Sequence, residues 1–309
     1  MTEHKSKLEA VGFIGLGIMG LPMVRNLLKE GIEVLAYDLN QASLDAAIAD
    51  GAKVATSAQV VAQERGIIIT MLPDTPDVEA VLFGQGGVAE GLSAGKLIID
   101  MSSISPEATV DFASRINYLD CTYLDAPVSG GEGKAITGEM TIMVGGPEDS
   151  FNRAQDAFNA MGATVSLIGT RNGDGQVCKV ANQIIVGVTT CGVAEALLFA
   201  AKSGADPKMV RQALMGGAAN SMILENHGQR MLDRNFDPTF RASLQRKDLG
   251  LAVDGAGKTG IYLPQATSAW QIFNACLANG DGDMDSISIL KVLEQMAGYK
   301  IEETSRCRA

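Results

Sequence analysis

The chain has 309 residues, of which 46% are hydrophobic and 20% are charged, and its formal net charge is -11 with a pI near 4.7. That length fits two domains, and the composition is typical of a soluble globular protein with a large buried core. The acidic balance, without any run of Lys and Arg, argues against nucleic acid or an anionic membrane as partner. A small anionic substrate would therefore need a local positive site.

The first ten residues, MTEHKSKLEA, are polar and lack the apolar core of a secretion signal, so we expect a cytoplasmic protein. The cysteines include no CxxC pair, which favours reduced thiols and offers no zinc-site spacing. They are Cys121, Cys178, Cys191, Cys276 and Cys307. No bound metal is expected.

The first motif joins a short apolar run, VGFIG, to the sequence GLGIMG and then to the helical pattern LPMVRNLLKEG. This order of strand, glycine turn and helix is the context that a dinucleotide-binding GxGxxG motif requires. The first glycine permits a tight turn, the second lets a pyrophosphate approach the backbone, and the third lets the helix pack on the strand. The predicted cofactor contacts are Gly15, Leu16, Gly17, Ile18, Met19 and Gly20.

A second predicted strand, residues 32–37, ends at Asp38, eighteen residues after Gly20. A carboxylate there would accept hydrogen bonds from the hydroxyl groups of the adenosine ribose. It would repel a 2′-phosphate, and no arginine is adjacent to it, so NAD is favoured over NADP. The alternative is that Asp38 is a turn or N-cap residue ahead of a helix that starts near Ala42.

Apolar runs and helical patterns then alternate, with strands predicted at 66–72 and 96–101 and helices at 77–83 and from 105 onward. This alternation predicts an α/β fold with a doubly wound parallel sheet. Ligands of such sheets bind at the carboxyl ends of the strands. That rule places Leu72, Pro73 and Ser103 beside the cofactor.

The strand predicted at 122–125 runs into DAPVSGGEGKA. Ser129, Gly130 and Gly131 offer one hydroxyl and unobstructed backbone N–H groups, which together could hold a substrate carboxylate. Taken alone, a glycine-rich segment is more often a plain turn. Two more strands, at 140–144 and 164–168, are predicted around a helix that begins near Pro147.

After Thr170 the pattern is helical throughout, so we predict a Rossmann domain at 1–171 and an all-helical domain at 172–309. A long helix from about Gly175 joins them and is apolar nearly all round. Such a helix is expected between a domain and a partner subunit. A membrane span is disfavoured because only fifteen residues separate Lys179 from Glu195, whereas spanning needs ~20.

Lys179 is a cation within this apolar helix, and Asn182 and Gln183 share its face at helical spacing. A lysine that snorkels from a buried helix is the alternative. Neither His4 nor His227 is placed like a catalytic base, and no Tyr-x-x-x-Lys pair occurs. Lys179 is thus the candidate proton donor for a nicotinamide reaction, with burial expected to lower its pKa.

A further cation, Lys247, precedes an apolar helical run together with Asp248. It is either a buried functional cation or part of an exposed charge pair in the first turn of a helix.

These segments together resemble the β-hydroxyacid dehydrogenases. The resemblance rests on GFIGLGIMGLPMVRNLL, DMSSISP, DAPVSGG, GDGQVCKVANQ and KDLGLAVD, which occur in order over nearly the whole chain. It implies a Rossmann domain followed by a helical domain, and a homodimer or homotetramer built through the long helix. It also implies Lys179 as catalytic acid/base with Asn182 beside it, Ser129, Gly130 and Gly131 on the substrate carboxylate, and Lys247 near nicotinamide and substrate.

Within the family, SGGEGKAITG, IDMSSISP and DRNFDPTFR favour reduction of tartronate semialdehyde to glycerate with NADH. KDLGLA equally resembles members that act on 3-hydroxyisobutyrate, so another short 3-hydroxyacid is the alternative substrate. A redox-silent NAD-binding protein is the alternative of a different class, and Lys179, Asn182 and Ser129 argue against it. A decarboxylating relative of the 6-phosphogluconate dehydrogenase type would need a longer helical domain.

Overall fold

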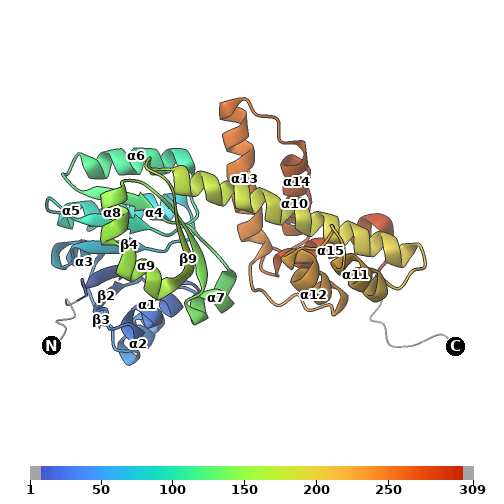
Figure 1. Cartoon of the computed structure of the whole chain (residues 1–309), viewed down its shortest axis with the longest axis horizontal. Coiled ribbons are helices and arrows are strands. Elements are labelled where there is room, and N and C mark those ends of the chain that lie inside the picture. The colour runs from blue at the N-terminus through green and yellow to red at the C-terminus, as the bar shows by residue number, and fades with distance from the viewer. Residues whose placement is uncertain (1–7, 302–309) are drawn as a thin grey trace. The chain divides into compact units, whose positions relative to one another are not determined.

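The computed structural model describes residues 8–301, so His4, Cys307 and most of the polar N-terminal segment lie outside the described residues. The chain forms two compact units, Met1–Lys179 and Val180–Ala309. The long helix α10 (Asp174–Lys202) begins in the first unit and continues through the second (Figure 1). The domain boundary at 171/172 stays a prediction from the sequence.

The first unit is built on one sheet, with strands in the order β3-β2-β1-β4-β5-β6-β8-β7 and β9 paired with β8. The strands are β1 (Val11–Ile14), β2 (Val34–Tyr37), β3 (Lys53–Val54), β4 (Ile67–Thr70), β5 (Leu97–Asp100), β6 (Thr122–Asp125), β7 (Val128–Ser129), β8 (Met140–Gly145) and β9 (Gly162–Gly169). All pairs from β3 through β6 are parallel, so the predicted doubly wound sheet is confirmed.

One feature of the sheet was not predicted. β8 runs antiparallel to both β6 and β7, because β7 continues the direction of β6 and the chain then reverses through helix α7 (Gly131–Thr137). β9 is parallel to β8 and extends the sheet beyond it.

Helices cover both faces of the sheet (Figure 1). They are α1 (Gly20–Lys29), α2 (Gln41–Ala49), α3 (Ala58–Glu64), α4 (Thr75–Phe83), α5 (Val88–Gly91), α6 (Pro106–Asn117), α7, α8 (Glu148–Arg153) and α9 (Gln155–Met161). Alternate strand residues divide between two cores: Ile69 and Ile99 pack with α1 and α9, whereas Ile68 and Ile98 pack with α3 and α6. Apolar side chains on both faces explain why these strands are continuous hydrophobic runs.

The second unit is all-helical, as predicted. After α10 it contains α11 (Pro207–Met215), a π-helix η1 (Ile223–His227), α12 (Gly228–Leu232), α13 (Ala242–Thr259), α14 (Pro264–Ala278), a 3₁₀ turn η2 (Ser286–Ser288) and α15 (Ile289–Ala297). In the described part of this unit, the only β pairing is the isolated bridge between Arg241 and Asp285.

Among residues 8–301, α10 is the one helix long and apolar enough to span a membrane by length and composition. The core helix of a globular protein passes the same test. The C-terminal half of α10 supplies Ala194 and Leu197 to the core of the second unit, where they pack with Leu249, Phe273 and Leu290. This packing places the C-terminal half of α10 in the core of the second unit, while Ile185 and Phe199 on the same helix are exposed.

Candidate functional site

The glycine turn lies between β1 and α1, next to β4, where the strand order reverses. Gly15 has a φ of +98°, and a Cβ there would collide with the carbonyl oxygen of Met71. A Cβ on Gly20 would collide with the carbonyl oxygen of Gly15, whereas Gly17 faces open space. Each glycine is thus needed for the reason that dinucleotide binding assigns to it.

The first turn of α1 is suited to hold a pyrophosphate. Its N-cap residue, Met19, makes no side-chain cap hydrogen bond. The Leu21 N–H donates to the Gly17 carbonyl and Pro22 has no N–H, so the donors left to another acceptor are those of the turn and of Gly20. Ile18 is exposed and Leu16 is buried. The Leu16 N–H is donated to Asp38, so the donors open to a phosphate begin at Gly17.

Asp38 follows β2 and has its carboxylate fixed against the glycine turn. Oδ2 accepts the Leu16 N–H, and Oδ1 accepts the Asn40 N–H at 2.7 Å. The N-cap of α2 is Asn40, whose side chain accepts from Ala42, so Asp38 is a turn residue but not the cap. Its carboxylate oxygens keep lone pairs for ribose hydroxyls, and the next residue, Leu39, carries no positive charge for a 2′-phosphate.

The loops after β4 and β5 are tied together. The Leu72 N–H donates to the Ser102 hydroxyl at 2.9 Å, and Ser102 donates its own N–H to Asp100. Asp100 also accepts hydrogen bonds from Thr70 and Tyr123. This network gathers the predicted cofactor residues Leu72, Pro73 and Ser103 at the carboxyl edge of the sheet.

Asp100 and Asp125 are buried carboxylates beside the candidate site that the sequence did not lead us to expect. They are register partners at the ends of β5 and β6, and complete burial raises the pKa of Asp100 despite its hydrogen bonds. Two adjacent strand sequences that both end in Asp, LIID and TYLD, were the available signal. A carboxylate at the end of a buried parallel strand is costly unless it has partners.

Asp125 supplies the cap of α10. Its Oδ1 accepts the Gly173 N–H at 2.7 Å and its Oδ2 accepts the Gln176 N–H at 2.9 Å. Gly173 precedes the helix and has no side chain to do this, so a strand residue provides the carboxylate that an N-cap normally provides. Burial raises the pKa of Asp125 to about 6, although these hydrogen bonds oppose the shift.

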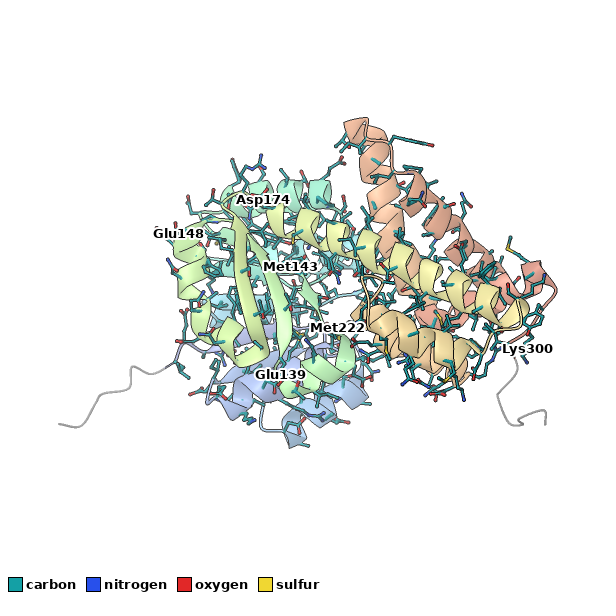
Figure 2. All side chains as sticks on the ribbon, turned by 45° about the vertical axis from the view of Figure 1, so that its right-hand side comes forward. Glu139, Met143, Glu148, Asp174, Met222 and Lys300 are labelled. Carbon is teal, nitrogen blue, oxygen red and sulfur yellow. The ribbon has the colours of Figure 1, made fainter. Side chains whose placement is uncertain are left out.

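Two glycines let the helix come this close. A Cβ on Gly175 would lie 2.9 Å from Asp125 Oδ2, and a Cβ on Gly145 would lie 2.8 Å from the same oxygen. In Figure 2, Asp174 marks the start of α10 and Met143 marks β8 within the first unit. The first turn of α10 is therefore held at the carboxyl end of β6 by hydrogen bonds and packs closely against the ends of β6 and β8.

Lys179 lies three residues after Gln176 on α10, and its side chain is 7% exposed. Lys179 is therefore buried on a helix capped at the carboxyl edge of the sheet, and its role as a functional cation stays a prediction. Asn182 lies one turn later on the same helix and donates to Gln183 Oε1 at 2.7 Å.

In the second unit a polar chain continues from Gln183. Its Nε2 donates to Asp248 Oδ2 at 2.6 Å, and Lys247 Nζ lies 3.2 Å from Asp248 Oδ1. The alternative that Lys247 and Asp248 form an exposed first-turn pair is wrong. Their side chains are 17% and 4% exposed, and α13 begins earlier, at Ala242.

The carboxylate-binding candidates lie between β7 and α7. Ser129 ends β7, where it pairs with Thr141 of β8, and its hydroxyl makes no hydrogen bond to any of residues 8–301. Gly130 and Gly131 have φ values of +137° and +69°, which L side chains rarely adopt. The segment from Ser129 to Gly131 thus combines a serine hydroxyl with two successive residues of positive φ, which an ordinary helix start does not have.

The described part of the chain contains one histidine. His227 lies in η1, where burial lowers its pKa. Among residues 8–301, no three His, Cys, Asp or Glu side chains are grouped so that they could hold a metal ion.

Comparison with known proteins adds to this geometry. Residues 10–169 match a family model described as the NAD binding domain of 6-phosphogluconate dehydrogenase. Residues 173–293 match one described as NAD-binding of NADP-dependent 3-hydroxyisobutyrate dehydrogenase. The 2-hydroxy-3-oxopropionate reductase of Escherichia coli (strain K12) is 48% identical over 94% of this chain and 99% of its own. The chain belongs to the β-hydroxyacid dehydrogenase family.

Other family members agree in sequence and fold. The mitochondrial 3-hydroxyisobutyrate dehydrogenase of Mus musculus is 35% identical over 92% of this chain and 87% of its own. The structure of Mycobacterium tuberculosis 3-hydroxyisobutyrate dehydrogenase with L-serine has a TM-score of 0.86 at 30% identity, covering 93% of this chain and 99% of that one. The chain is thus an NAD(P)-dependent β-hydroxyacid dehydrogenase, and the second family match argues against the decarboxylating alternative.

Proposed function

We propose that this β-hydroxyacid dehydrogenase reduces tartronate semialdehyde to glycerate with NADH, and that Lys179 supplies the proton. The observation that carries the proposal is the position of Lys179: a buried cation on a helix whose first turn is capped by Asp125 at the cofactor edge of the sheet. The similarity to the Escherichia coli reductase supports this substrate over 3-hydroxyisobutyrate.

The residues divide the reaction between them. When bound, the nicotinamide supplies the hydride that forms the new C–H bond at the aldehyde carbon. The electron pair of the carbonyl π bond moves to oxygen, where the Lys179 ammonium stabilises the growing charge and donates a proton. The lysine is left as a neutral amine and regains a proton from solvent. Asn182, one turn along the helix, is proposed to steady it.

The substrate carboxylate is assigned to Ser129, Gly130 and Gly131. The hydroxyl of Ser129 and the N–H groups of a left-handed glycine pair match the geometry that anions prefer. Lys247, held beside Asp248, keeps the role near nicotinamide and substrate that the family resemblance gives it.

The cofactor is proposed to be NAD in preference to NADP, because Asp38 is fixed where a 2′-phosphate would meet it. We also propose a cytoplasmic protein, supported by the free thiols of Cys121, Cys178, Cys191 and Cys276. A homodimer or homotetramer is supported by apolar side chains exposed on α10 and α15.

The substrate assignment is tested with native protein and a panel of short semialdehydes, followed by loss of NADH absorbance. We expect kcat/KM for tartronate semialdehyde to exceed that for the semialdehyde that corresponds to 3-hydroxyisobutyrate by about tenfold or more, if the site hydrogen-bonds the additional hydroxyl group of tartronate semialdehyde. The reverse order would favour the 3-hydroxyisobutyrate alternative. If no semialdehyde in the panel causes oxidation of NADH, the alternative of a redox-silent NAD-binding protein is favoured.

A further inference from the structure

The Gln176 side chain is completely buried, and both ends of its carboxamide are used. Its Nε2 donates to the carbonyl oxygen of Ser102 at 2.8 Å, and its Oε1 accepts the Ile104 N–H at 3.2 Å. The Gln176 side chain thus hydrogen-bonds to both a carbonyl group and an N–H group of one short backbone segment, residues 102–104. Such paired hydrogen bonds fix both the distance and the orientation of the groups they join.

The segment that Gln176 holds is the loop after β5, which contains Ser103. Its neighbour Ser102 accepts the Leu72 N–H from the loop after β4 and is itself held by Asp100. Gln176 therefore connects the first turn of α10 to both loops that were assigned to the cofactor.

The helix does not need this side chain for its own stability, because Asp125 already caps the Gln176 N–H. A buried carboxamide costs free energy unless it is paired, and an apolar residue here would leave the Ser102 carbonyl and the Ile104 N–H without these partners. The two hydrogen bonds together select one rotation of the helix. Slippage by one residue would turn Lys179 by about 100° and move it about 1.5 Å along the axis.

We propose that Gln176 is a positioning residue that sets Lys179 against the loops after β4 and β5. This inference rests on the proposed role of Lys179 as proton donor. The residue acts through the backbone of Ser102 and Ile104 and through the helix, and it does not itself take part in proton transfer.

The first test replaces Gln176 with a side chain of similar length that cannot make the two bonds, Gln176→Met. We expect the single-turnover rate of semialdehyde reduction to fall about 10- to 100-fold, because a misplacement near 1 Å can cost about 10²-fold. KM for the semialdehyde should change much less than this rate, since the carboxylate-binding residues are untouched.

The matched control is Thr190→Val on the same helix. Thr190 is 1% exposed and donates to the carbonyl oxygen of Val186, so this change also removes a buried hydrogen bond from α10. We expect native turnover in the control. Thermal unfolding of both variants without cofactor shows how much stability each has lost.

A second variant, Gln176→Glu, separates positioning from general destabilisation. A protonated glutamic acid can donate to Ser102 and accept from Ile104 as the amide does, whereas a carboxylate would face the Ser102 carbonyl oxygen and lie near Asp125 and Asp100. The Lys179 ammonium, one turn away, opposes this effect. The single-turnover rate of Gln176→Glu divided by that of the native protein should therefore rise as pH falls. Dividing by the native rate removes the effect of groups that titrate in both proteins.

Lys179→Ala, measured in the same assay, separates a failure of the proposed function from a failure of the positioning inference. Near-native turnover in Lys179→Ala would overturn the proposed function itself. If Lys179→Ala is inactive but Gln176→Met retains the native single-turnover rate, or if the Gln176→Glu ratio does not change with pH, only the positioning inference is overturned.

Discussion

At the scale of single residues, Asp38 shows how one carboxylate can serve both the fold and the choice of cofactor. It accepts the N–H groups of Leu16 and Asn40, so it holds the glycine turn in shape before any ligand arrives. The same fixed charge should repel a 2′-phosphate. We therefore expect a preference for NADH over NADPH, because hydrogen bonds hold the Asp38 carboxylate where it would face the 2′-phosphate of NADPH.

This gives a prediction for the double change Asp38→Ser with Leu39→Arg. The ratio of kcat/KM for NADPH to that for NADH should rise about tenfold or more, because a repulsion is replaced by a charge-assisted hydrogen bond worth about 1.5–3 kcal/mol. Leu39→Arg alone, which retains Asp38, is the control and should shift the ratio less. An unchanged ratio in the double variant would show that Asp38 does not select the cofactor.

Residues with local sequence signals were predictable, and those that act across long separations were not. The three glycines of the turn were predicted because their spacing records a local backbone requirement. Asp125 and Gln176 make their decisive bonds over separations of 51 and 74 residues, and no local pattern announces such contacts. Gly145 and Gly175 look like ordinary glycines until the close approach of Asp125 is seen.

At the scale of elements, α10 is a helix whose beginning is stabilised by a strand. The buried Asp125 carboxylate caps it, and desolvation raises the pKa of that group from 3.8 to about 6, with the nearby Asp100 adding to the shift. The native state thus retains a proton that the unfolded chain releases. Binding of this proton in the native state therefore adds to the free energy of unfolding at low pH. The added stability falls as pH rises between the two pKa values, and above pH 6 it is lost.

The variant Asp125→Asn tests this linkage. Its carbonyl oxygen can accept one of the two N–H groups, and it carries no titrating proton. The native free energy of unfolding minus that of the variant should decrease by about 2 kcal/mol between pH 4 and pH 7, because a shift of roughly two pKa units corresponds to about 2.7 kcal/mol in full and part of that change lies below pH 4. Denaturant unfolding at several pH values measures it. A difference that stays constant with pH would contradict the titration of Asp125 in this range.

The elements themselves were predictable where hydrophobic periodicity is strong. The main parallel strands and the long helix are continuous apolar runs, so their existence followed from composition. The antiparallel β8 was not distinguishable from a parallel strand, because burial of both faces gives the same pattern in either direction. The two-residue β3 and the one-turn α5 are too short to carry a period.

At the scale of the whole molecule, the second unit leaves apolar side chains exposed. Phe199 on α10 is 75% exposed and Met296 on α15 is 77% exposed. With Leu198 and Leu293 they line a hollow of about 590 Å³. Clustered apolar surface of this kind is typical of a subunit interface, which supports the proposed homodimer or homotetramer.

We expect Phe199→Glu to shift the protein toward smaller species in sedimentation velocity, since a charge in an apolar interface is desolvated without a partner. Tyr118→Glu is the control, because Tyr118 is 89% exposed and belongs to the first unit, whereas the hollow is lined by residues of the second. A native protein that sediments as a monomer, or a Phe199→Glu variant with the native assembly, would rule out this surface as the interface.

The central claim is that Lys179 donates the proton during semialdehyde reduction, and the most direct measurement is single-turnover reduction of tartronate semialdehyde by Lys179→Ala, paired with NADH titration by fluorescence. Lys208→Ala, at an exposed lysine on α11, is the control and should behave as the native protein. We predict that Lys179→Ala binds NADH normally, because the glycine turn is untouched, and that its turnover rate falls about 10²- to 10⁴-fold. Near-native turnover in Lys179→Ala would contradict the account.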